Sequence, residues 1–325
     1  MTQDKDKNKW YIKSFLGFSG WLGAVFFIFF FSLFFGNILA KNIGALCIIG
    51  LILIMVSYMM LLHQKNEFVE QFALANILTG EALLIWSIVD SIKSSSSLLI
   101  IGLFLALMMW IVPHYIHRVI TSVGMSISFY TFAIDLKAVE YFLSLYALIS
   151  FGLLLYKDSF KYQEKIEAIS YGMVMLFVGI LSIEYFPSYL YHNAKYINLS
   201  QYGLIDISLN IMLLLVAWQI SKEYNIWQHK KSFLILVIAI IATLGISLFV
   251  KGILVGIILL LIGFWQKDKR VLSLGILVGL FYISKYYYFL GDTLLDKSKA
   301  LFISSMLFGI GYFILKYLTK DNKYA

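Results

Sequence analysis

Long apolar stretches alternate with short polar segments along almost the whole chain. A helix that crosses the hydrocarbon core of a bilayer needs about 20 mostly apolar residues, within a range near 17–25. On that scale the sequence predicts about twelve such helices, at residues 15–39, 43–62, 70–89, 97–112, 119–135, 139–156, 170–187, 204–220, 233–249, 252–266, 271–290 and 299–317. The stretches lack the period-2 alternation of barrel strands, and a helix in lipid satisfies its own backbone hydrogen bonds. We therefore expect transmembrane helices.

The Lys and Arg residues give these helices a direction, because cytoplasmic loops collect basic residues. With the N-terminus inside, 18 of the 26 basic residues fall in inner segments and seven in outer turns, with Lys285 inside a helix. The sequence thus predicts an all-α, polytopic transmembrane helical bundle of about 12 spans, with both termini cytoplasmic. The polar segments are too short to bury a core, so residues 1–325 are interpreted as one integral membrane domain. Gly252/Gly256 and Gly275/Gly279 predict close helix packing.

Composition agrees with this interpretation. The chain is 61% hydrophobic and only 14% charged, whereas a soluble domain carries about 25% charge. Its net charge of +8 is explained by basic loops, and no basic stripe beside exposed aromatics indicates a nucleic-acid partner. Cys47 is the only cysteine, which excludes an internal disulfide or a thiolate metal cage. The first apolar stretch is longer than a signal-peptide core, so we expect a retained helix.

Ionisable residues within the apolar stretches are the candidate functional groups, because they are costly in lipid. Glu70 and Glu81 lie eleven positions apart, within about 20° of whole helical turns, so they share one face. Glu70 is expected at the interface and Glu81 deeper. One hypothesis pairs Glu81 with Lys285; in the alternative, Lys285 extends toward the outer headgroups. Glu184 and Asp206 lie near the outer ends of their helices. In one interpretation they line a cation or proton path together with Glu81; in the other they are helix-end residues in contact with water.

Histidine and tyrosine residues offer weaker signals. Among five histidines only His114 and His117 are close in sequence, and no carboxylate or third histidine stands beside them. We therefore expect loop histidines, with no metal site, no cofactor and no recognisable catalytic motif. The outer segments are rich in tyrosine, which forms either an aromatic belt at the interface or a docking surface. These residues are Tyr189, Tyr191, Tyr286, Tyr287 and Tyr288.

The C-terminal stretch resembles a bacterial membrane-protein family catalogued as domain of unknown function 4401. The residues that carry the resemblance are Arg270, Tyr286, Tyr287, Tyr288, Leu290, Thr293, Leu294, Leu295, Lys297 and Ser298. The resemblance implies a multi-pass protein of the bacterial inner (cytoplasmic) membrane. It also implies two partners besides the lipid bilayer: a membrane protein of a neighbouring unknown-function family, and a small protein with a GDYxxLxY motif. It implies no established activity.

Three functional hypotheses follow. The first is transport of a small solute or ion through a bundle whose interior carries Glu81, Glu184, Asp206 and Lys285. The second is a non-catalytic scaffold or partner subunit of an envelope membrane complex, with the outer tyrosines as its docking surface. An intramembrane enzyme acting on lipid-linked substrates comes third, because no paired catalytic groups stand out.

Overall fold

The computed structural model of the chain describes residues 10–39, 42–63, 66–184, 203–228, 230–249 and 252–289, with six single residues between 295 and 309. Within these residues the fold is all helical, as predicted, with eleven α-helices and two short 3₁₀ turns. The helices are α1 (Trp10–Leu39), α2 (Ile43–His63), α3 (Glu67–Ile92), α4 (Ser96–Ile111), α5 (Tyr115–Asp135), α6 (Val139–Leu155), α7 (Gln163–Glu184), α8 (Gly203–Glu223), α9 (Lys230–Phe249), α10 (Ile253–Trp265) and α11 (Lys269–Phe289).

The first eleven predicted stretches each coincide with one helix, and the twelfth lies mostly outside the described residues. Five helices begin at least three residues earlier than predicted: α1, α3, α5, α7 and α9. α7 begins at Gln163 instead of 170, because the charged segment before the apolar run also buries Ala168 and Ile169. α5 begins at Tyr115 instead of 119, because His114 caps it.

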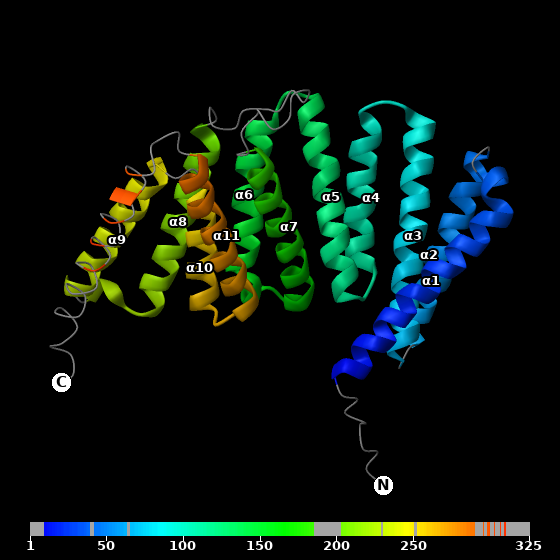
Figure 1. Cartoon of the computed structure of the whole chain (residues 1–325), viewed down its shortest axis with the longest axis horizontal. Coiled ribbons are helices and arrows are strands. Elements are labelled where there is room, and N and C mark those ends of the chain that lie inside the picture. Colours follow the sequence, from blue (N-terminus) through cyan, green and yellow to red (C-terminus); the bar gives the residue numbers. More distant parts are fainter. Residues whose placement is uncertain are drawn as a thin grey trace, which may run out of the picture. The chain divides into compact units, whose positions relative to one another are not determined.

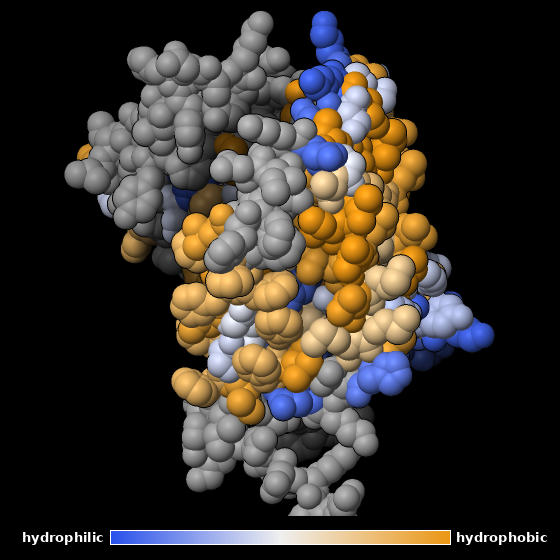
Figure 2. Space-filling view, turned by 90° about the vertical axis from the view of Figure 1, so that its right-hand side faces the viewer, coloured by the Kyte–Doolittle hydropathy of each residue, from blue (hydrophilic) through white to orange (hydrophobic). Residues whose placement is uncertain are grey.

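Four of the described helices, α2, α3, α7 and α8, are long and apolar enough to cross a membrane, which suggests a membrane protein. Their outward side chains fit that environment. Ile48, Ile52 and Met55 of α2, for example, are exposed on the helix surface. On the face drawn in Figure 2, apolar side chains cover most of the described surface, and hydrophilic ones gather toward its top and bottom.

The chain divides into two compact units. The first contains Met1–Leu143 and Tyr156–Phe177, and therefore α1 to α5 and most of α7. The second contains Ser144–Leu155 and Val178–Ala325, and therefore most of α6 and α8 to α11. The interpretation of the whole chain as one domain stays a prediction.

In the first unit, α3 is the helix against which its neighbours pack. α2 and α3 meet where Gly50 and Gly80 face each other: a Cβ atom on Gly80 would lie only 2.7 Å from the Gly50 carbonyl oxygen. Ile77 of α3 forms an apolar cluster with Met108 and Val112 at the end of α4. Figure 1 shows α3, α4 and α5 running up and down in succession, joined by short turns. At the start of α5, His114 and His117 reach the side chains of Glu70 and Glu81 on α3.

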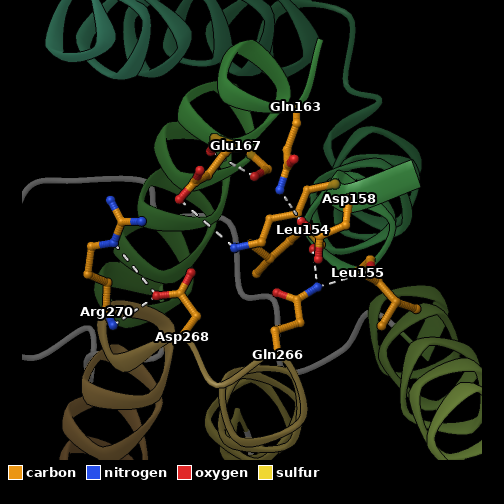
Figure 3. A network of polar contacts seen from close by, with 10 residues as sticks. Leu154, Leu155, Asp158, Gln163, Glu167, Gln266, Asp268 and Arg270 are labelled. Carbon is orange, nitrogen blue, oxygen red and sulfur yellow. Dashed lines mark hydrogen bonds and ion pairs between the residues drawn. The ribbon is translucent and has the colours of Figure 1, made fainter. Parts of the chain in front are cut away.

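In the second unit, α10 and α11 form a tight hairpin. A Cβ atom on Gly256 would lie 2.9 Å from Gly279 Cα, and one on Gly275 would lie 2.7 Å from the Leu260 backbone nitrogen. The close packing predicted from these glycines is confirmed. The turn between the two helices is anchored by Gln266, whose Nε2 atom donates to the carbonyl oxygens of Leu154 and Leu155 at 2.9 and 3.1 Å (Figure 3).

Candidate functional site

Two carboxylates of α3 each contact a histidine at the start of α5. Glu70 and Glu81 share one face of α3, as their spacing predicted. His114 immediately precedes α5, and His117 lies in its first turn. The four side chains belong to the first unit, and together with Thr121 we call them the acid–imidazole cluster.

Glu81 and His117 form the buried half of the cluster. His117 Nε2 lies 2.8 Å from Glu81 Oε1, and the two side chains are 0% and 4% exposed. Thr121 Oγ1 lies 3.3 Å from both ring nitrogens of His117 and donates to the His117 carbonyl oxygen at 2.6 Å. The contact between acid and base is thus shielded from solvent, where hydrogen bonds and charges act more strongly than in water.

Glu70 and His114 form the half of the cluster that reaches solvent. His114 Nε2 lies 3.1 Å from Glu70 Oε1, and the Glu70 side chain is 42% exposed while that of His114 is 7% exposed. The other ring nitrogen, Nδ1, accepts a hydrogen bond from the backbone N–H of His117 at 3.3 Å. Because an accepting nitrogen carries no proton, neutral His114 has its proton on Nε2 and donates it to Glu70.

The connection between α4 and α5 explains why the histidines lie here. Val112 closes α4 through its backbone N–H to the Met108 carbonyl oxygen, and its side chain is fully buried against Ile77 of α3. Pro113 follows and donates no backbone hydrogen bond. His114 then adopts an extended backbone and caps α5. Since Ile77 belongs to the same face of α3 as Glu81, the apolar contact brings the first turn of α5 toward both carboxylates.

Burial also sets the proton affinity at the solvent end of the cluster. Removal from water lowers the pKa of His114, because a charged imidazolium is disfavoured there. The Glu70 carboxylate opposes that effect, and the neighbouring His117 and Arg118 add to it. The His114 imidazole is therefore neutral near neutral pH and takes up a proton when the solution becomes more acidic.

Further polar groups line α5 and α3 nearby. Thr121, Ser122, Ser126 and Ser128 are buried on α5, and each hydroxyl donates to a carbonyl oxygen of the same helix. Arg118 Nε and Asn76 Oδ1 are also buried, with no hydrogen-bond partner among the described residues. The cluster therefore lies in the most polar part of the first unit's interior, beside an additional positive charge.

Chemically, the cluster can hold and exchange a proton. A carboxylate and an imidazole at hydrogen-bond distance share one proton, as an imidazolium–carboxylate pair or as two neutral groups. Within the described residues, no group of three or more His, Cys, Asp or Glu side chains is arranged to hold a metal ion. Proton chemistry is the property that the geometry offers.

The expectation that the histidines lack a carboxylate beside them was wrong. It considered neighbours in sequence, whereas Glu70 and Glu81 approach from another helix. The missed signal is the polarity of α5, whose segment from His114 to Ser128 is rich in histidine and hydroxyl residues, unlike the other apolar stretches. Such a helix needs a polar neighbour inside an apolar fold.

The other predicted path residues are not joined to this cluster by the described contacts. Lys285 is partly buried on α11 and Asp206 is partly buried on α8, both in the second unit. The pair of Glu81 with Lys285 would link the two units and stays a prediction. The side chain of Glu184 lies outside the described residues, as do Tyr189, Tyr191 and the side chains of Tyr286, Tyr287 and Tyr288.

The family-like residues fall at the second unit's end. Arg270, at the start of α11, has its Nε atom 3.6 Å from Asp268 Oδ1, and its backbone N–H donates to the same oxygen at 3.0 Å (Figure 3). Leu295 and Ser298 are exposed, whereas Thr293, Leu294 and Lys297 lie outside the described residues. The Asp268 carboxylate therefore caps the first turn of α11.

Comparison with known proteins adds one match. The model of a family described as "Domain of unknown function (DUF4401)" matches residues 9–318, nearly the whole chain. No curated protein and no solved structure matches the chain.

Proposed function

We propose, for a chain that belongs to the DUF4401 family, a proton-handling role in a membrane. The protein would be a multi-pass protein of the bacterial inner membrane, with about 12 spans and cytoplasmic termini. It would move protons, alone or together with a small solute, and Glu81 and His117 would hold the proton in transit. The 2.8 Å contact between these two buried side chains carries the proposal.

Physical chemistry supports this assignment over a purely structural role. Ionisable side chains inside a membrane bundle are expensive, and they characteristically mark proton relays and substrate paths. A leucine or methionine would fill the same space without the cost of burying a polar pair. Glu70 and His114 continue the polar cluster to solvent, which gives a proton a route to or from the buried pair.

The membrane placement is supported by two independent patterns. Four of the described helices are long and apolar enough to span a bilayer. The alternation of lysine-rich and lysine-poor turns follows the rule that sets orientation in the cytoplasmic membrane. The family-like residues at the C-terminal end agree with an inner-membrane location.

The test is proton flux in liposomes that contain the purified full-length protein and a pH-sensitive dye. An imposed pH gradient should decay faster than in empty liposomes, and Glu81→Gln and His117→Gln should restore the slow decay. Asp90→Asn is the matched control. Asp90 lies on the same helix and contacts exposed Lys93 at 3.9 Å, so this variant should behave as the wild type.

Two results would count against the proposal. A wild-type protein that leaves the gradient untouched, with or without a panel of small solutes, removes the transport role. Unchanged flux in Glu81→Gln removes the assigned pair. A silent protein that co-purifies with one stable envelope protein would instead favour the scaffold hypothesis, whose partner is a neighbouring-family membrane protein or the small GDYxxLxY protein.

A further inference from the structure

We propose that His114 is a proton-sensing N-cap of α5 that positions His117 against Glu81. Protonation of His114 would break the cap and free the first turn of α5 to move. The inference rests on the proposed function, because it names how the proton-holding pair is regulated. It assigns His114 a positioning role, since the residue reaches Glu81 only through His117. The geometry of the His114 ring carries the argument.

Both ring nitrogens of His114 form hydrogen bonds, one as a donor and the other as an acceptor. Nε2 donates to Glu70 Oε1 at 3.1 Å, and Nδ1 accepts from the His117 backbone N–H at 3.3 Å. The second bond is the N-cap of α5. A helix cap of this kind satisfies a backbone donor that the helix cannot satisfy itself. The residue that receives the cap is His117, whose ring contacts Glu81.

A second proton on His114 must go to Nδ1, because Nε2 already carries one. Two donors would then face each other, the Nδ1–H of His114 and the N–H of His117, so the cap is lost. At the same time the imidazolium binds the Glu70 carboxylate more strongly than the neutral ring does. Protonation therefore draws His114 toward α3 and leaves the first turn of α5 without its cap.

The charges that face His114 come from two helices. Glu70 of α3 favours the protonated ring, whereas His117 and Arg118 of α5 disfavour it. Burial is the largest effect and lowers the pKa of His114 below its ordinary value of about 6.5. The cap is thus fully present above pH ~6.5 and is lost as the pH falls through the lower folded-state pKa.

The contact between His117 and Glu81 therefore depends on the pH through the His114 cap. His117 Nε2 stays 2.8 Å from Glu81 Oε1 while the first turn of α5 keeps its place. When that turn loosens, the contact between the two side chains lengthens. Acidification on the Glu70 side would therefore open the pair, which is the direction expected of a proton-triggered gate.

The experiment uses the full-length protein in lipid nanodiscs with ¹⁵N-labelled histidine, and follows the imidazole signals between pH 8 and pH 5. Nitrogen shifts report the tautomer and protonation of each ring. Single substitutions assign the five histidines. We expect the His114 signals to change at a midpoint below ~6.5 and those of His117 to change at the same midpoint.

Three variants make the test specific. In His114→Asn, the amide oxygen keeps the cap but does not titrate, so the change of the His117 signals at that midpoint should disappear. In Glu70→Gln, loss of the carboxylate should move the shared midpoint to lower pH. His63→Gln should leave it unchanged, because His63 is exposed and contacts the Met59 carbonyl oxygen of its own helix, α2.

The proposal is overturned if the His117 signals stay constant while His114 titrates. It is also overturned if His114→Asn leaves the His117 transition intact, or if Glu70→Gln leaves the midpoint in place. Failure of the proposed function looks different: liposomes would show no proton flux although the signals of the two histidines change at the same midpoint. The midpoint measured for Glu70→Gln tests the proposal even if the His114→Asn variant does not fold.

Discussion

At the scale of single residues, the buried contact of Glu81 with His117 is the most demanding feature of the fold. Each group alone would be costly to bury as an ion, and each satisfies the other as either a charged or a neutral pair. The exposed contact of Glu70 with His114 lacks this constraint, because water solvates the carboxylate. The two contacts join the same types of side chain, but they differ in burial and therefore in energy.

Glu81→Gln should destabilise the protein far more than Glu70→Gln. Removing one partner of a buried pair strands the other and costs about 3–5 kcal/mol. The matched change at half-exposed Glu70 should cost less than ~1 kcal/mol. The measurement is reversible unfolding in mixed detergent micelles, with His117→Gln completing a double-mutant cycle at Glu81. Similar losses at both glutamates, or no coupling in the cycle, would contradict the assignment.

The sequence located one side of this site and missed the other. Glu70 and Glu81 were found because a helix repeats every 3.6 residues, so their spacing alone places them on one face. The histidines were missed because cross-helix contacts depend on how α4 turns into α5. The packing of Val112 against Ile77 and the His114 cap determine that turn. Neither interaction produces a periodic pattern in the sequence.

At the scale of helices, α3 serves two neighbours on different faces. Gly80 meets Gly50 of α2 at backbone distance, and the next residue, Glu81, reaches α5. The position of the carboxylate is therefore tied to the closest approach of α2 and α3. Because Gly80 and Glu81 are consecutive, a displacement of α3 away from α2 would also move Glu81 and disturb the acid–imidazole cluster.

Gly80→Ala should destabilise the first unit and disturb the Glu81 contact. Its new Cβ atom would lie 2.7 Å from the Gly50 carbonyl oxygen and 2.8 Å from Ile54 Cγ1, and such overpacking costs about 1–3 kcal/mol. Gly179→Ala is the control. That helical glycine has open space around it, so alanine should be neutral or stabilise by up to ~1 kcal/mol. Thermal unfolding of the two variants checks the difference, and equal melting temperatures would argue against the close approach.

Helix positions were largely predictable, whereas helix starts were not. An apolar run long enough to span lipid has one stable backbone arrangement, so the run itself predicts the helix. The starts of α5 and α7 lie in polar segments, where capping by His114 and burial of Ala168 and Ile169 extend the helix. Those interactions belong to tertiary packing, which a hydropathy pattern does not contain.

At the scale of the whole molecule, loop charge predicts how the chain crosses the membrane. Basic residues gather in alternate loops, and the segments 157–165 and 267–270 are expected on the same, cytoplasmic side. An odd number of helices between them would separate these segments. The positions of the loops relative to the membrane therefore test the number of spans directly.

Cysteine labelling should show that pattern in intact cells. In a Cys47→Ser background, a membrane-impermeant thiol reagent should label Ser94→Cys and Leu136→Cys but reach Lys161→Cys and Lys269→Cys only after permeabilisation. All four positions are exposed, so access depends on the side of the membrane. Labelling of Lys161→Cys and Lys269→Cys on opposite sides would refute the twelve-span topology.

The buried hydroxyls of α5 have one more consequence. Because Thr121, Ser122, Ser126 and Ser128 donate to carbonyl oxygens of their own helix, those hydroxyl protons tie α5 to no neighbour. Ser122 instead abuts Gly172 of α7, and at the far end of the helix Asp135 accepts a hydrogen bond from the Ser95 hydroxyl at 2.7 Å. Hydroxyls bonded in this way also ease helix bending. With hydrogen bonds at both of its ends and self-bonded hydroxyls between them, α5 is suited to flex at its middle.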